Sequence, residues 1–499
     1  MLLLGPAFAQ AEHLPWEIAP YRTLVWIETL QNCHLDAAFF KRFVNTLDDQ
    51  RYATSGSVLA TDMQRAPMPL ARWFAGDLAS SSFVSRLENR DLKVDDYDRI
   101  QLISIERDGD WTITFREFDT LTRTWGSVHR SSVRQQSLLS TAILRIIYEK
   151  FAALAKITDV EKPSVSLALK ATTLIEEENH TRERRLLDGM TFSWPVEDFD
   201  WKKPPVLGPS VVSDAGRLPG SMSVGEALQP ILRRNDRQGN LVPSNGIMVM
   251  PWTYVRCDVN DGLQFKGTMI SGYTQPLPGR RNVRTQRLAL GVQPAYDATD
   301  LKLVDKSTDA TALAGYEIYS KEPSGPNLLG ASDARGNVRI SRDPHSAVRA
   351  LYVRSGGNLL ARLPVVPGHE PLVTARIPND SPRLLAEGFV EGWRDQLVET
   401  MARRQILAQR VQRKIELGEL DDAEKWLAEL QSGRTVNELA FELRSAKGQF
   451  LKENHLDPMI KHRIDELFEK GQRLVTQDKS LLIEGKLAKQ LEEAQKAQR

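Results

Sequence analysis

Two short clusters of aspartates could supply the paired carboxylates of a glycosidase. The first cluster holds Asp95, Asp96 and Asp98, and the second holds Asp198 and Asp200. A glycosidase needs two carboxyl groups about 5 to 9.5 Å apart across a sugar ring. Acids this close together in sequence, beside aromatic residues, are more typical of solvated loops. The sequence therefore favours a loop role for both clusters and keeps catalysis as the alternative.

A basic segment between two expected strands could hold an anionic group. Arg280 and Arg281 lie in the expected turn, and Arg284 lies on the strand that follows. Guanidinium groups bind carboxylates and phosphates through paired hydrogen bonds, so these arginines could grip an envelope polymer. Trp201 and Trp252 could add stacking surfaces for sugar or peptide. The alternatives are arginines that keep an exposed hairpin soluble and tryptophans that lie in a core.

The familiar catalytic and cofactor motifs are missing from the sequence. The 8 histidines are scattered, and neither H-E-x-x-H nor C-x-x-C occurs, so no metal site is predicted. The glycine-rich phosphate loops and the G-x-S-x-G serine motif are absent as well. We therefore predict no catalytic residue and no cofactor, and the sequence favours a non-enzymatic protein.

Length and charge limit the classes of function. A chain of 499 residues is too long for one ordinary core, so several domains are expected. The 66 basic residues nearly balance the 65 acidic ones, which disfavours a nucleic-acid partner. No apolar run approaches the roughly 20 residues of a membrane-spanning helix.

The first residues favour export. An apolar run precedes Ala9-Gln10-Ala11, a small-residue pattern of the kind cut by signal peptidase, so residues 1–11 are expected to be the remnant of a signal peptide. Cys33 and Cys257 are the two cysteines. They could form one interdomain disulfide in an oxidising compartment, although two buried thiols are the simpler interpretation.

Residues 12–189 are expected to form an α/β domain. Expected strands at 23–30 and 56–61 alternate with expected helices at 36–49 and 69–80. Further along the chain, two alternating runs meet at Asp108-Gly109-Asp110, which predicts a hairpin. A long helix is expected over 134–157, where apolar residues recur at helical spacing.

The segment YDRIQLISIERDGDWTITFREFDTLTRTWGS carries a resemblance, with Asp119 and Thr122 at its corner. It resembles the α/β domain of envelope proteins such as the curli-secretion and synthase-activating lipoproteins, over residues 20–175. The resemblance implies binding in the envelope and no catalytic residue. The whole chain resembles an exported bacterial protein.

Residues 190–294 and 295–380 are expected to form two β-rich domains. Short strands between proline and glycine turns suit a small barrel or an open sheet in the first. Seven short runs between 299 and 377 predict a β-sandwich in the second. The segment resembles the carboxypeptidase-regulatory-like, transthyretin-like sandwich at Ser332, Asp333, Gly336, Tyr352, Val353 and Gly356. In such domains Asp333 closes a turn and Gly336 takes a positive φ.

Residues 381–499 are expected to form an all-α bundle. Apolar residues recur at helical spacing from Trp393 onward, Gly418 ends the first helix, and the last segment, with its thin apolar face, is expected to fray. The predicted class is multidomain α+β.

We interpret the chain as an exported, periplasmic or cell-envelope protein that acts as a non-enzymatic scaffold or binding module. The partner would be an envelope polymer or another envelope protein. The alternative is a hydrolase of an envelope polymer that uses carboxylates as acid and base.

Overall fold

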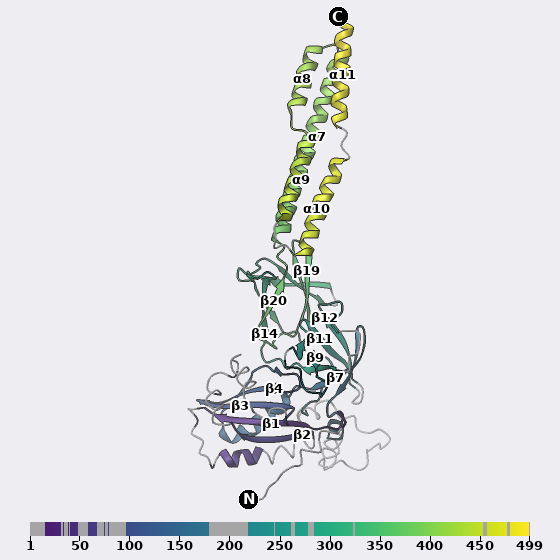
Figure 1. Cartoon of the computed structure of the whole chain (residues 1–499). Helices are drawn as coiled ribbons and strands as arrows, with labels where there is room; N and C mark the ends of the chain where they lie inside the picture. Colours follow the sequence, from purple (N-terminus) through teal and green to yellow (C-terminus); the bar gives the residue numbers. More distant parts are fainter. Residues whose placement is uncertain are drawn as a thin grey trace, which may run out of the picture.

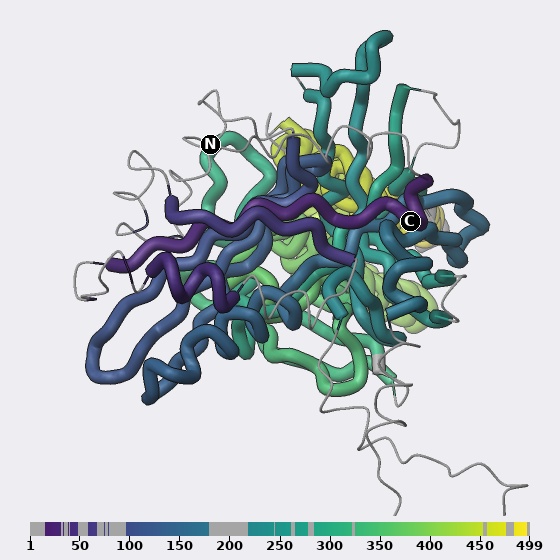
Figure 2. The backbone as a smooth tube through the Cα atoms, turned by 90° about the horizontal axis from the view of Figure 1, so that it is seen from below, coloured from purple at the N-terminus to yellow at the C-terminus, as the bar shows by residue number. Residues whose placement is uncertain are grey.

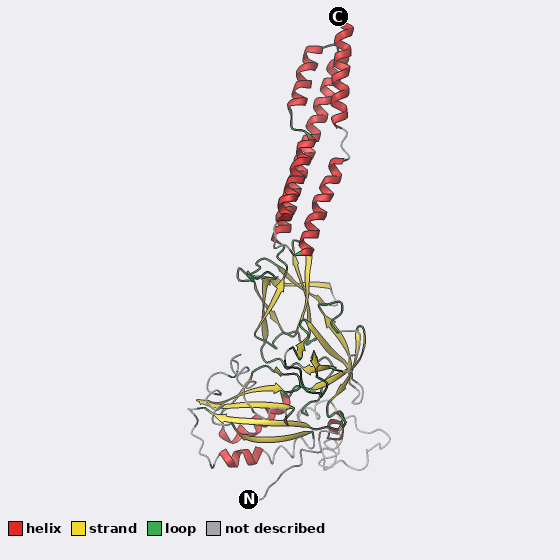
Figure 3. Cartoon of the chain, viewed as in Figure 1, coloured by secondary structure: helices red, strands yellow, loops and turns green. Residues whose placement is uncertain are grey.

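The protein is elongated, with a sheet near its N-terminus, a β-rich middle and a helical arm (Figure 1). The structure is a computed structural model, and the residues it describes are 15–30, 33, 38, 40–47, 58–66, 74, 78, 96–178, 218–243, 245–260, 265–277, 284–322, 325–452, 457–476 and 480–498. Helices and several sheets occur together, and the last part of the chain is helical (Figure 3). The predicted α+β class is therefore confirmed.

The first sheet has six strands in the order β2-β1-β3-β4-β5, with β6 paired to β4. Strand β1 is parallel to β2 and β3, as expected of an α/β arrangement, and the β3–β4 hairpin turns at Gly109 with φ 72°. In the view from below, strands of this sheet cross in front of the arm (Figure 2). The elements of this part are β1 (Tyr21–Thr29), β2 (Leu59–Arg65), β3 (Arg99–Asp108), β4 (Asp110–Asp119), β5 (Thr124–Trp125), β6 (His129–Val133), the short 3-10 helix η3 (Gln136–Leu138) and α4 (Leu139–Glu149).

One expected helix of this region ends early, and another lies mostly outside the described residues. The helix expected over 134–157 is wrong at its C-terminal end, because α4 ends at Glu149 and strand β7 begins at Leu154. The apolar run after Glu149 fits either state, and pairing with other strands decides it. The helix expected at 69–80 lies outside the described residues except at Phe74 and Leu78, which are both buried.

The middle sheet closes into a small antiparallel barrel. Its order is β10-β9-β11-β12-β8-β7-β13, and β13 also pairs with β9. Two of its strands, β7 and β8, come from before residue 190, so the sheet crosses the boundary that the sequence suggests. Cys257 is buried in the barrel, and Cys33 is buried in the core beside the first sheet. Both are free thiols and form no disulfide with each other. The strands are β7 (Leu154–Glu161), β8 (Ser164–Leu169), β9 (Ala227–Arg234), β10 (Ile247–Val249), β11 (Thr253–Asn260), β12 (Phe265–Ser271) and β13 (Thr285–Gly291).

The next seven strands form two facing sheets. The strand orders of the two sheets are β17-β14-β20 and β16-β15-β18-β19. Each of the seven strands coincides with one of the seven short runs seen in the sequence. The Asp333 carboxylate accepts the N–H groups of Arg335 and Asn337, and Gly336 has φ 79°. This stretch is a turn, as expected. The strands are β14 (Ala298–Asp305), β15 (Glu317–Glu322), β16 (Gly325–Ala331), β17 (Asn337–Ser341), β18 (Arg349–Ser355), β19 (Asn358–Val365) and β20 (Leu372–Ile377).

The arm is built around one long helix, α7. Its 36 residues correspond to about 54 Å. Helices α9 and α10 pack on its N-terminal half around Trp393, and α8 and α11 pack on its C-terminal half around Val411. The last segment does not fray: α11 is helical to Gln498 and buries Leu487 and Leu491. The helices are α7 (Ser381–Glu416), α8 (Leu420–Ser432), α9 (Val436–Lys452), α10 (Pro458–Thr476) and α11 (Ser480–Gln498).

A buried arginine joins the two halves of the arm. Arg404 of α7 donates to the carbonyl oxygens of Leu430 at 3.3 Å and Arg434 at 3.2 Å, beside the C-terminus of α8. It also forms an ion pair with Glu484, in the second turn of α11. Helix C-termini leave carbonyl groups without partners, and a cation there is stabilising. One side chain therefore secures the ends of two helices.

Candidate functional site

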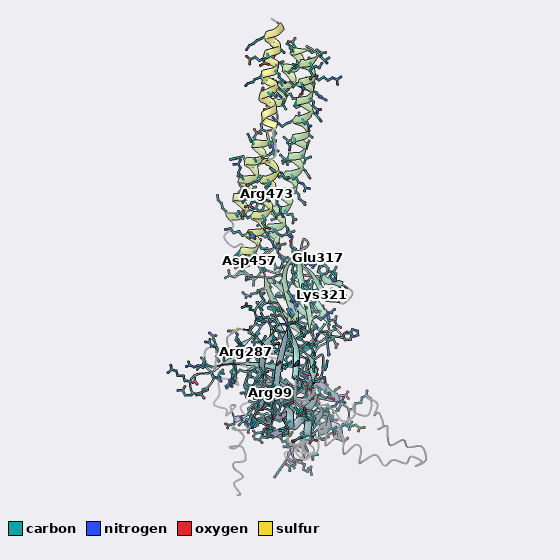
Figure 4. The ribbon with its side chains drawn as sticks, turned by 90° about the vertical axis from the view of Figure 1, so that its right-hand side faces the viewer. Arg99, Arg287, Glu317, Lys321, Asp457 and Arg473 are labelled. Atoms are coloured by element: carbon teal, nitrogen blue, oxygen red, sulfur yellow. The ribbon has the colours of Figure 1, made fainter. Side chains whose placement is uncertain are left out.

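One candidate site is a pocket of about 320 Å³ where the barrel, the sandwich and the arm meet. Strands β19 and β20 supply its sandwich side, and the start of α10 supplies its arm side. In Figure 4, Asp457 marks this place at the base of the arm, well away from Arg99 in the N-terminal part. The lining includes Trp252, Tyr273, Lys306, Arg362, Arg376 and Asp457.

Trp252 enters the pocket from a constrained turn. Its φ is +51°, in the left-handed region that a bulky side chain rarely adopts. Its carbonyl accepts the N–H of Gly272 at 2.9 Å. A Cβ at Gly272 would lie 2.3 Å from the carbonyl oxygen of Arg362, so glycine allows β19 to approach the barrel closely. The barrel and the sandwich together hold Trp252 at the pocket.

The charge of the pocket is mainly positive. Lys306, Arg362 and Arg376 line it, against one carboxylate, Asp457. Lys306 Nζ lies 3.4 Å from Asp457 Oδ2, an ion pair between the sandwich and the arm. Arg362 lies over the ring of Tyr352, with its guanidinium carbon 5.8 Å from the ring centroid. The arrangement can hold an anionic ligand against an aromatic surface.

A second, smaller pocket of about 50 Å³ lies between the first sheet and the barrel. The Ser127 hydroxyl lies 3.0 Å from Nδ1 of His369 and donates to the His369 carbonyl oxygen at 2.5 Å. Because that contact takes the single hydroxyl proton, the imidazole does not act as a base toward Ser127. The pair links distant parts of the chain and does not form an activated nucleophile.

The histidines of this cavity are neutral near pH 7. Burial, together with the positive charge of Lys150, lowers the pKa of His129 to about 4. Burial also lowers the pKa of His369 to about 4. The carboxylates of Glu117 and Asp119 line the same cavity. In the part of the chain that the structure describes, no group of three or more potential ligands could hold a metal ion.

A buried ion network lies beside this cavity and includes one of the candidate aspartates. Arg99 is fully buried and pairs with Glu117 at 3.3 Å and with Asp119. The Asp98 carboxylate pairs with Lys170 at 2.7 Å. The expectation of a solvated loop acid is therefore wrong for Asp98, because the charge of Lys170 compensates its burial.

The remaining candidate aspartates are placed only in part. Asp96 is exposed, as expected of a loop acid. Asp95, Asp198 and Asp200 lie outside the described residues.

The predicted binding residues are only partly placed. Trp252 lines the pocket, whereas Arg284 is exposed before β13 and does not line it. Arg280, Arg281 and Trp201 lie outside the described residues. Sequence reasoning missed the other lining residues, Tyr273, Lys306, Arg362 and Arg376. Exposed arginines at alternate strand positions occur on most sheets, so no sequence signal marks them.

Comparisons with known proteins add little. No protein-family model matches the chain, and no curated protein matches it. Among solved structures, the chain is similar to a group B streptococcus pilus 2b backbone protein, at 10% identity over 55% of this chain and 96% of that one, with a TM-score of 0.14. A score this low carries no argument about fold or function. None of the helices among the described residues is long and apolar enough to cross a membrane.

Proposed function

We propose that the protein is an exported, non-enzymatic scaffold or binding protein of the cell envelope. Its partner would be an envelope polymer or another envelope protein. The observation that carries this proposal is the helical arm, which extends away from the β-rich body (Figure 1). An arm of this kind adds reach and surface, which a binding protein uses and a compact catalytic domain does not need.

The construction of the arm supports a role as a spacer. Helix α7 runs its full length without a break, and the shorter helices cover both of its halves. Arg383 fixes the base of α7: it pairs with Asp380 at 2.7 Å and donates to the carbonyl of Ser355 in the sandwich. The arm is thus joined to the body by buried polar contacts as well as by apolar packing.

Pull-down from a cell-envelope fraction, with the whole chain as bait, tests the proposal. We expect retention of a polymer or of one envelope protein, and recovery of the protein itself from the envelope fraction of its source. A parallel incubation with purified envelope polymer should release no new reducing ends. Catalytic release of such ends would contradict the proposal and favour the hydrolase. Recovery only from the cytosol would contradict export.

A further inference from the structure

The pocket at the base of the arm has the composition of a site for an acidic sugar. We propose that it binds a carboxylate-bearing saccharide, with a sugar ring against Trp252 and Tyr273 and the carboxylate on Arg362 and Arg376. This inference rests on the proposed function and names the ligand class of the envelope polymer. A volume of about 320 Å³ suits a short saccharide unit.

The aromatic residues are placed for contact with a ligand. Tyr273 is 48% exposed, and Trp252 is partly buried against the core of the sandwich and arm. Both rings line the pocket, where an aromatic side chain offers a rigid apolar face to a bound ring. The left-handed backbone of Trp252 is a second, independent observation, because strained residues persist mainly where the surrounding structure enforces a functional position.

The positive charges of the pocket favour an anionic ligand, and the two arginines are better placed than Lys306 to bind it. Lys306 already faces Asp457 at 3.4 Å. Arg362 and Arg376 are exposed at the pocket and present planar forks that match the two oxygens of a carboxylate. A ligand carboxylate would therefore bind the arginines, while the lysine remains with the arm.

An acidic peptide fits less well than a saccharide. A peptide commonly binds by pairing with an exposed edge strand, and β19 is the edge strand of its sheet. That edge is occupied: the carbonyl of Leu359 accepts a hydrogen bond from Arg463 of the arm, and the carbonyl of Arg362 lies against Gly272 of the barrel. A sugar ring needs no backbone edge and uses the aromatic faces that are present.

Calorimetric titration of the whole chain with tri-galacturonate tests the proposal. We expect saturable binding that weakens with salt, and much weaker binding of neutral maltotriose. Trp252→Ala, Arg362→Gln and Arg376→Gln should each weaken binding by about tenfold or more, as expected for loss of a charged hydrogen bond or a stacking surface. The matched control is Arg339→Gln, at an exposed position of β17 in the same sandwich, which should bind as the parent does. A melting temperature equal to that of the parent protein would show that each variant keeps the fold.

Several results would overturn this inference. The first is that tri-galacturonate does not bind. The second is that maltotriose, tri-glutamate or inorganic phosphate binds as tightly as tri-galacturonate does. The third is that Arg339→Gln weakens binding as much as the pocket variants do. If binding fails while the pull-down still recovers an envelope polymer, the pocket assignment is wrong and the scaffold proposal stands. If the polymer is degraded while tri-galacturonate still binds through Arg362, the scaffold proposal is wrong and the pocket assignment stands.

Discussion

Replacing Arg404 with alanine tests whether one side chain holds the two halves of the arm together. Arg404 is 5% exposed, and its guanidinium contacts the carbonyls of Leu430 and Arg434 and the carboxylate of Glu484. The substitution removes this donor from the carbonyl of Leu430, at the end of α8, and from that of Arg434, in the loop that follows, and it removes the partner of the Glu484 carboxylate. We expect the arm to become markedly less stable.

The magnitude follows from the burial of the partners. Breaking a fully buried ion pair by removing one partner costs about 3 to 5 kcal/mol. The side chain of Glu484 is 19% exposed, so water can solvate part of its charge. The lost hydrogen bonds to the carbonyls add to the cost, because each is worth about 1 kcal/mol or more. We therefore expect a loss of about 3 kcal/mol in the free energy of unfolding.

The assay is urea unfolding of the whole chain, followed by the helical circular dichroism signal. The matched control is Arg403→Ala, because the neighbouring Arg403 has a side chain that is 71% exposed and pairs with Glu429 at 3.1 Å on the surface. This control should change the free energy by no more than about 0.5 kcal/mol. An Arg404→Ala effect as small as that of Arg403→Ala would refute the reasoning. The double variant Arg404→Ala/Glu484→Ala should be less destabilised than the sum of the single changes.

The other predictions concern processing, a turn, pH and the arm. Protein isolated from its source should begin near Glu12 by N-terminal sequencing, and an intact Met1 would contradict export. Gly336→Val should destabilise the sandwich by more than about 2 kcal/mol, because φ is +79° and a Cβ would lie 2.3 Å from the carbonyl oxygen of Leu303. The control Gly357→Val, at φ +77° with open space around it, adds the backbone strain without the clash. Equal losses of stability in the two variants would show that the clash contributes nothing. From pH 7 to 5 the free energy of unfolding should fall by about 2 kcal/mol for each of His129 and His369, because their pKa of about 4 lies below the ordinary 6.5 and the unfolded chain binds more protons. Replacing both histidines with glutamine should remove that loss. A loss of the same size in the double variant would contradict the lowered pKa of these two histidines. The fragment 381–499 should be soluble and cooperatively folded by circular dichroism, whereas folding only when mixed with the rest would show that the arm needs the body.

The sandwich and its turn could be predicted because their signals are local. Each strand is a short apolar run ended by a turn residue, and Gly336 occupies the turn position that needs a positive φ. The end of α4 could not be predicted, because the run from Phe151 to Ile157 suits a buried helix and a buried strand equally. Its pairing with β13, far along the chain, decides the outcome.

The pocket was mostly hidden from sequence reasoning for a different reason. Trp252 draws attention as a large aromatic residue in a turn, but the other lining residues come from five separate segments of the barrel, the sandwich and the arm. Arg362 and Arg376 lie at exposed positions of strands, where arginine also serves solubility. Asp98 resembles a loop acid until Lys170, 72 positions away, is brought against it by the fold.

The closure of the barrel has a consequence for synthesis on the ribosome. Leu154 of β7 pairs with Leu290 of β13, so the barrel remains open until almost 300 residues have been made. The core of the first sheet also includes Ile231 and Leu288 from the barrel, so it stays incomplete for the same time. Long-range pairings of this kind fold slowly and expose apolar strands meanwhile. The apolar strands of the nascent chain therefore stay exposed until β13 has emerged, whereas the helices of the arm, which are made last, pack mainly on one another.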